Sequence, residues 1–148
     1  MTLRAWGRMT GTAALVMCLA TPPVWAERMM RFGNFEAHYS LVPTTLLKPV
    51  VASRYDIVRG RDRALLNVSV LEGGERAVRA HVTGVVRDLM GQVREITFRE
   101  VVEGEAVYYL SEIRHDDQEV LRFSIALRTP DGRQHELAFQ QKMYWEHG

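Results

Sequence analysis

Apolar and polar residues alternate with a period of two along most of this sequence. The clearest case is the segment 64–71, where Ala64, Leu66, Val68 and Val70 form one wholly apolar face and the residues between them a mixed one. A period of two with one apolar face is typical of a β-strand with one buried side. We therefore predict that 64–71 is a central strand of the hydrophobic core.

Similar runs on both sides of this segment predict further strands. Turn-forming residues such as Asp131-Gly132 separate the runs at intervals of about 8–12 residues, the spacing of β-sandwiches and barrels. Pro43 and Pro49 favour short turns, one of them helical, after the first run. The predicted strands cover 35–42, 55–58, 64–71, 78–86, 94–101, 106–113, 121–127 and 135–145.

The pattern as a whole predicts an all-β protein. No amphipathic helix of ordinary length appears after residue 26. Loops of hairpin length imply antiparallel pairing between neighbouring strands. We predict a single immunoglobulin-like antiparallel β-sandwich of about eight strands. A small β-barrel is the alternative, and the pattern does not separate the two well.

The first 26 residues follow a different pattern, that of a secretory signal peptide. Arg4 and Arg8 precede a short apolar run at 12–20, and the segment ends on a small residue at Ala26. The run is shorter than the roughly 20 residues that span a bilayer. We predict cleavage between Ala26 and Glu27, export to the periplasm, and a single mature domain, 27–148, with no transmembrane span.

Cys18 raises the alternative of a lipoprotein whose acylated cysteine would begin the mature chain. The residue before it, Met17, is too bulky for the small residue expected at that position. Cleavage at Cys18 would also cut the apolar run short. We therefore favour cleavage after Ala26.

The composition after residue 26 argues against several classes of function. Without Arg4 and Arg8 the chain keeps 17 basic and 18 acidic residues, a formal charge of −1. Nucleic-acid binding needs a basic face, so we predict no nucleic-acid partner. The only cysteine, Cys18, leaves with the signal peptide, so we expect no disulfide, catalytic thiol or thiolate metal site. About 120 residues can bury enough surface to fold without such cross-links.

Short motifs spread over nearly all of the mature chain carry a family resemblance. They lie at 33–39, 46–52, 55–59, 65–70, 82–84, 88–92, 107–110 and 139–141. Through them the sequence resembles an uncharacterised family of short secreted proteins from Gram-negative bacteria, known as a domain of unknown function. The resemblance implies a periplasmic single-domain protein. It implies no activity, cofactor or catalytic residue.

Arginines at alternate positions are the first candidate site. Arg59, Arg61 and Arg63 would point in one direction from an extended backbone, with Arg54 close by. Guanidinium groups placed in this way can grip a carboxylate or a phosphate. The alternative is a solvated loop whose charge is neutralised by the two aspartates within 54–63. We carry all four arginines forward as candidate binding residues.

The row Glu36, His38 and Ser40 is the second candidate, because these residue types occur together in hydrolases. Catalysis needs direct contact between nucleophile, imidazole and acid. Alternate residues on one strand face stand about 7 Å apart, too far for such contacts. We therefore predict no catalytic residue here and keep His38 as a candidate binding residue.

Metal binding and an aromatic patch are the remaining candidates. The four methionines and five histidines after residue 26 suit copper by type, but none has ligand spacing, so we predict no metal and no cofactor. Tyr109 is a candidate binding residue if it faces outward together with Tyr144, since tyrosine is enriched at interfaces. The run 106–113 does not reveal which of its side chains face outward.

These observations favour a non-enzymatic binding or protein-interaction module. Its partner is unknown, and a periplasmic or envelope protein is the candidate that the predicted export suggests. The alternative is a small metal-handling protein or enzyme that uses His38 and nearby polar residues. The sequence suggests no substrate class.

The cleavage site gives the first testable prediction. Mass spectrometry of the exported protein should find Glu27 as its first residue, because the small or apolar residues at 24–26 fit signal peptidase. An acylated Cys18 at the N-terminus would contradict this expectation.

Overall fold

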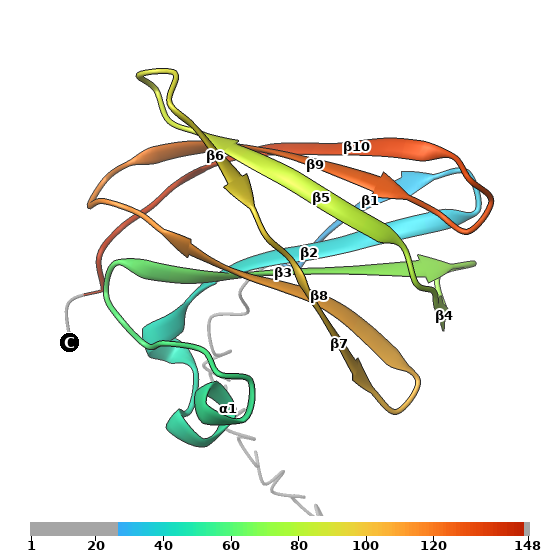
Figure 1. Cartoon of the computed structure of the whole chain (residues 1–148), viewed down its shortest axis with the longest axis horizontal. Coiled ribbons are helices and arrows are strands. Elements are labelled where there is room, and N and C mark those ends of the chain that lie inside the picture. Colours follow the sequence, from blue (N-terminus) through green and yellow to red (C-terminus); the bar gives the residue numbers. More distant parts are fainter. Residues whose placement is uncertain (1–26, 147–148) are drawn as a thin grey trace, which may run out of the picture.

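The computed structural model describes residues 27–146, and within this range the chain forms a two-layer β-sandwich (Figure 1). The predicted signal peptide lies outside the described residues. The strands are β1 (Arg28–Phe32), β2 (Phe35–Pro43), β3 (Arg63–Glu72), β4 (Arg76–Ala77), β5 (His81–Arg87), β6 (Val93–Ile96), β7 (Arg99–Glu103), β8 (Ala106–Arg114), β9 (Val120–Arg128) and β10 (Gln134–Lys142). A short 3-10 helix, η1 (Thr44–Leu46), and one helical turn and a half, α1 (Pro49–Arg54), stand between β2 and β3.

Both layers are antiparallel and open. The first sheet has the order β1-β2-β3-β8-β7, with β4 added to the end of β3, and the second has the order β10-β9-β5-β6. Neither order returns to its first strand. The predicted all-β sandwich is therefore confirmed, and the barrel alternative is wrong.

The core is the apolar layer between the sheets. On β3 the alternation predicted from the sequence holds, and Ala64, Leu66, Val68 and Val70 are at most 2% exposed. Opposite them β9 contributes Leu121, Phe123, Ile125 and Leu127, equally buried. Because β2 and β8 flank β3 on its two sides, 64–71 is the central strand that we predicted.

Aromatic side chains seal one side of the sandwich, where β1 lies beside β10. The ring of Phe139 stacks on Phe123, with centroids 4.6 Å apart, and contacts Tyr39 at 4.7 Å. Phe32 stacks on His135 at 4.7 Å. Such ring pairs add stabilisation beyond their burial, so this side is firmly closed.

The other side is split, because the chain changes sheets there. The single strand predicted at 94–101 is instead two strands, β6 in one sheet and β7 in the other. The crossing occurs at Thr97-Phe98, where Phe98 packs against Gly84: a Cβ on Gly84 would lie only 3.4 Å from the Phe98 ring. Alternation of side chains survives such a crossing, so the sequence pattern did not reveal it.

Because the chain changes sheets before β7, β7 is too short to pair with the whole of β8. β7 pairs with residues 106–110 of β8, whereas β3 pairs with residues 109–114. Among the described residues, nothing pairs with residues 111–114 on the side away from β3. Half of β8 is therefore an open sheet edge.

Three further predictions about strands differ from the structure. β1 was not predicted, because its five residues show no regular alternation of buried and exposed positions. The predicted strand 55–58 is a turn, because Asp56 has a positive φ of 52° just after α1. The last strand ends at Lys142 rather than at residue 145.

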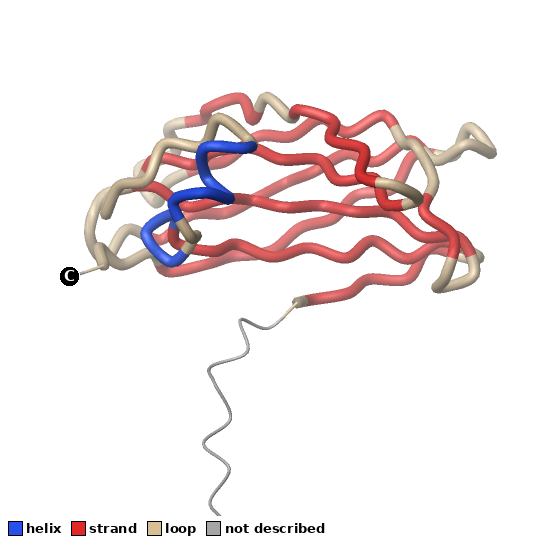
Figure 2. The backbone as a smooth tube through the Cα atoms, turned by 90° about the horizontal axis from the view of Figure 1, so that it is seen from below, coloured by secondary structure: helices blue, strands red, loops and turns tan. Residues whose placement is uncertain are grey.

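The segment 44–62 leaves the sandwich and lies against the outer side of the first sheet, as Figure 2 shows for α1. We call it the excursion. Its Ala52 and Ile57 are buried, and so is Leu110, which alternation places on the outer face of β8. Within residues 27–146 no helix is both long enough and apolar enough to cross a membrane.

The packing of β3 gives a stability prediction. Leu66→Ala should lower the free energy of unfolding by about 2–5 kcal/mol, because it leaves a cavity beneath a fully buried side chain. Leu89→Ala is the matched control, since Leu89 is 62% exposed, and should change stability by less than about 0.5 kcal/mol. Urea denaturation measures both; equal effects would contradict the assigned core.

Candidate functional site

The candidate arginines diverge instead of pointing in one direction. The guanidinium of Arg59 donates to the Thr45 carbonyl at 2.7 Å, and that of Arg63 to Glu112 at 3.0 Å. Arg61 lies over the Trp145 ring, 4.4 Å from its centroid. The backbone turns at Arg61-Asp62, so these residues lack the extended geometry that would align them. Arg54 is exposed at the end of α1.

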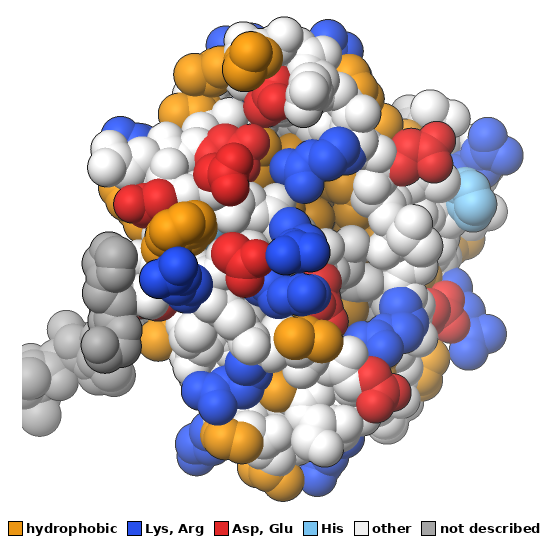
Figure 3. Space-filling view, turned by 60° about the vertical axis from the view of Figure 1, so that its left-hand side comes forward, with side chains coloured by type: hydrophobic (Ala, Val, Ile, Leu, Met, Phe, Trp, Pro, Cys, Tyr) orange, Lys and Arg blue, Asp and Glu red, His pale blue; other side chains and the backbone are white. Residues whose placement is uncertain are grey.

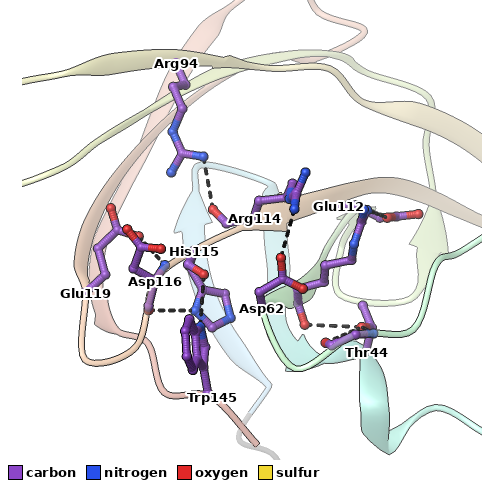
Figure 4. A network of polar contacts seen from close by, with 11 residues as sticks. Thr44, Asp62, Arg94, Glu112, Arg114, His115, Asp116, Glu119 and Trp145 are labelled. Carbon is purple, nitrogen blue, oxygen red and sulfur yellow. Dashed lines mark hydrogen bonds and ion pairs between the residues drawn. The ribbon is translucent and has the colours of Figure 1, made fainter.

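Thr44 fixes the shape of this bend. Its hydroxyl is fully buried, accepts a hydrogen bond from the Gly60 backbone N–H at 3.0 Å, and lies 3.2 Å from the carbonyl oxygens of Gly60 and Arg63 (Figure 4). One small side chain therefore joins the start of the excursion to its end. The bend is held from a residue 16 positions earlier in the chain.

Glu112 ties the excursion to the outer face of β8. One of its carboxylate oxygens accepts from the Val58 backbone N–H at 3.1 Å, and the other pairs with Arg63 at 3.0 Å. Nearby, the Tyr55 hydroxyl donates to Glu103, and this hydrogen bond is the main reason why the pKa of Tyr55 is raised. These contacts hold residues 55–63 against β7 and β8.

A second network lies at the end of β8 (Figure 4). The Arg114 guanidinium donates to the Asp62 carboxylate at 3.0 Å and holds the pKa of that carboxyl below its ordinary value. Asp62 therefore stabilises the fold at neutral pH, and this contribution is lost as the pH falls through the lowered pKa. From β6, Arg94 donates to the Arg114 backbone carbonyl at 3.0 Å and so bridges the split side of the sandwich.

The C-terminal segment is fastened to the loop between β8 and β9. The Trp145 indole N–H donates to the His115 carbonyl at 3.3 Å, and its backbone N–H donates to Asp117 at 3.0 Å. His115 is buried, and its own backbone N–H donates to the Asp62 carbonyl at 3.0 Å. The Arg61 guanidinium lies over one face of the Trp145 indole ring. The arginine bend, the loop and the C-terminal segment therefore support one another.

Two adjoining hollows lie along the split side. One, of about 410 Å³, is lined by both sheets, with Val86, Ile96 and Ile113 among its apolar residues. The other, of about 710 Å³, lies between the β5–β6 and β8–β9 loops. Arg94 and Arg114 line both, and we call the two hollows together the groove. On the face presented in Figure 3, hydrophobic side chains show at the bottom of a hollow among charged ones.

The open half of β8 borders this groove. In an antiparallel sheet, the backbone groups of successive residues point alternately toward the two neighbouring strands. The hydrogen bond from His115 to Asp62 points toward β3, so the backbone groups of Glu112 and Arg114 point away from β3. Of these groups, the Arg114 carbonyl already accepts a hydrogen bond from the Arg94 guanidinium. The site thus combines hydrogen-bonding backbone groups with an apolar hollow.

His38 lies elsewhere, on the outer face of β2, in a row of polar side chains that contact one another. Its Nε2 is 3.1 Å from Glu36 and its Nδ1 is 3.3 Å from Glu27, while Glu36 also pairs with Arg31 at 3.0 Å. We expected Glu36 and His38 to be too far apart for contact, and this was wrong, because long side chains lean along the strand. The two carboxylates approach opposite ring nitrogens, so they do not converge on one point.

Tyr109 faces the core and forms no outward patch with Tyr144. Its ring is 4% exposed, whereas Tyr144 is 55% exposed. The Tyr109 hydroxyl accepts from the Ala80 backbone N–H at 2.8 Å and lies 3.2 Å from Glu100. Burial raises the pKa of Tyr109. These contacts give the residue a structural role between β8 and the approach to β5.

Comparison with known proteins places the chain in a family. Residues 29–146 match the model of a domain of unknown function, DUF4426. The chain belongs to the DUF4426 family. This confirms the resemblance drawn from the sequence. Comparison with curated proteins gave no significant match.

Solved structures agree with this affiliation. A DUF4426 protein from Pseudomonas aeruginosa is 31% identical, with a TM-score of 0.73, over 82% of this chain and 97% of that one. A copper-bound variant of FetP from uropathogenic Escherichia coli is 12% identical, with a TM-score of 0.56, over 82% of this chain and 97% of that one. A second FetP structure, of protein expressed in the periplasm, is 11% identical, with a TM-score of 0.54, over 82% and 96%. At these identities FetP shares the fold alone.

Sequence reasoning missed the residues that build the bend and the groove of this DUF4426 protein. Thr44, Arg94 and Arg114 belong to separate segments, and no motif connects them. Glu112 sits in an apolar run whose alternation was unclear. The one available signal was a charged residue inside that run, since buried strands rarely contain one without a partner.

Neighbouring threonines provide a test of the bend. Thr44→Val should lower the free energy of unfolding by about 1–3 kcal/mol, because it leaves the Gly60 backbone N–H buried without its acceptor. Thr45→Val is the matched control: the Thr45 hydroxyl is buried with no partner among the described residues, so its loss should be neutral or stabilising. Thermal and urea unfolding measure both. Equal destabilisation by the two changes would contradict the role given to Thr44.

Proposed function

We propose that this DUF4426 protein is a periplasmic, non-enzymatic binding module that holds an extended segment of another envelope protein along the open half of β8. The observation that carries the proposal is the open edge at 111–114 beside an apolar-floored groove. Extended peptides commonly bind by adding a strand to such an edge. Main-chain hydrogen bonds then supply affinity, and the adjacent hollow supplies specificity.

Arg94 has a defined part in this proposal. An exposed edge invites unwanted pairing with other chains, and proteins protect such edges with charged side chains. In the free protein the Arg94 guanidinium donates a hydrogen bond to the Arg114 carbonyl from across the groove. An incoming strand takes over that carbonyl with its own backbone N–H, and the released guanidinium is then free to pair with acidic side chains of the bound segment.

Export to the periplasm rests on the sequence of the first 26 residues. Their basic start, short apolar run and the small residue Ala26 before Glu27 are typical of a cleaved signal peptide. The partner that we propose is therefore a protein of the same compartment or of the bounding membranes.

Copper is the alternative ligand to weigh, since FetP has been solved with copper bound. No group of three or more His, Cys, Asp or Glu residues within 27–146 is placed to hold a metal. At His38 a metal on either ring nitrogen would have only one of the two neighbouring carboxylates within reach. The arrangement of donors therefore favours the peptide-binding proposal over a metal-handling role.

Photo-crosslinking in the periplasm tests the proposal. A photoreactive phenylalanine analogue at Thr97, which lines the groove, should give an adduct with a specific envelope protein. In the purified complex, backbone amide exchange at Glu112 and Arg114 should slow, because these N–H groups gain partners.

Thr83 provides the matched control. It is also an exposed threonine and lines a separate hollow of about 710 Å³ on the outer face of the second sheet. The same analogue at Thr83 should give no such adduct. Adducts from Thr83 alone, or unchanged exchange at Glu112 and Arg114 in the complex, would refute binding along β8.

A further inference from the structure

Exposed apolar side chains gather on the excursion, at the end of the molecule that carries α1. Leu46, Val50 and Val58 are 48%, 66% and 53% exposed, and Val51 is 37% exposed. Single exposed hydrophobic residues are ordinary, but these four lie within thirteen residues of one segment. We call them together the patch, since exposed apolar groups that gather in one region mark contact surfaces. They do not line the groove.

The fold of α1 turns Val50 away from the protein. Ala52 is the buried residue of the helix and faces the first sheet. Val50 and Arg54, four residues apart, share the opposite face of the helix. In Figure 1, α1 lies below the first sheet at one end of the sandwich, so the helix face opposite Ala52 is turned away from the sheets.

The excursion is also the basic part of a slightly acidic molecule. The excursion contains four basic side chains, those of Lys48, Arg54, Arg59 and Arg61, and two acidic side chains, those of Asp56 and Asp62. Its formal charge is therefore +2, whereas the predicted mature chain as a whole carries −1. Arg59 uses one donor on the Thr45 carbonyl, but a guanidinium has five, so most of its donors stay available.

We propose that the excursion docks this protein onto the surface of an anionic phospholipid bilayer. Exposed valine and leucine side chains enter the boundary between headgroups and acyl chains, and flanking lysine and arginine side chains pair with lipid phosphates. Charge complementarity favours this occupant over a second copy of the chain, because two copies would bring two excursions of formal charge +2 together. The proposal is independent of peptide binding in the groove.

Docking on a bilayer would also determine where the peptide segment bound along β8 lies relative to the membrane. Asp56 of the excursion lines the groove, so the open edge of β8 lies next to the proposed membrane contact. A segment held on that edge would run close to the bilayer surface. The favoured partner is then an envelope protein whose extended segment lies near the membrane.

Vesicle sedimentation tests the proposal with the exported protein. We expect binding to vesicles of phosphatidylethanolamine and phosphatidylglycerol, weaker binding in about 0.5 M salt because charges are screened, and little binding to pure phosphatidylcholine. Val50→Asp should weaken binding about tenfold, because the exposed side chain no longer enters the bilayer. Arg54→Gln should weaken it about fivefold, as expected for one basic residue at an anionic surface.

Matched controls come from the opposite sheet. Val93→Asp and Arg128→Gln change the same residue types at exposed positions on β6 and β9, and should bind like the unaltered protein. Val50 is exposed, so Val50→Asp should keep the thermal unfolding midpoint.

Three results would overturn the proposal: no binding to the anionic vesicles, equal binding to both kinds of vesicle, or unchanged binding by Val50→Asp. A concentration-dependent dimer that Val50→Asp abolishes would also overturn it, because a second copy would then cover the patch. None of these results bears on the adduct expected at Thr97, so the two proposals fail separately.

Discussion

The unequal pairing of β8 is the constraint on which the rest of this structure depends. β3 supports its second half and β7 its first half, and only residues 109–110 have neighbours on both sides. Buried backbone groups must find partners, so a strand that loses one neighbour needs support from elsewhere. Here Arg94 reaches across from β6 to the Arg114 carbonyl, and Asp62 fixes the Arg114 side chain. The polar residues at this end thus stand in for a missing strand.

The same strand connects the two surfaces that we propose. Its edge borders the groove, while Glu112 on its outer face fastens Val58 and Arg63 of the excursion. An incoming strand at 111–114 would therefore pack beside the residue that orients the excursion. Both surfaces lie on the split side, away from the aromatic seal between β1 and β10. Binding sites are commonly held in position by a rigid scaffold, and here the aromatic seal between β1 and β10 is part of that scaffold.

The sequence could predict what depends on local alternation, and little of what depends on partners distant in the chain. It identified β3 and the sandwich, because period two and turn residues report directly on burial. It did not separate β6 from β7, since alternation continues through Thr97-Phe98 while the pairing partner changes. The run 106–113 was ambiguous because Leu110 is buried on the outer face while Tyr109 is buried on the inner one.

The candidate arginines show why residue type and side-chain direction are separate problems. The sequence shows that they are close together in the chain, but their directions depend on Thr44, Glu112 and Trp145, which come from three other parts of the chain. FetP shares the sandwich at 12% identity, so the sandwich itself tolerates almost complete replacement of its residues. A shared sandwich therefore does not decide what a protein binds. Our two proposals rest instead on the excursion and on the open half of β8, and Glu112 joins these two parts of the chain.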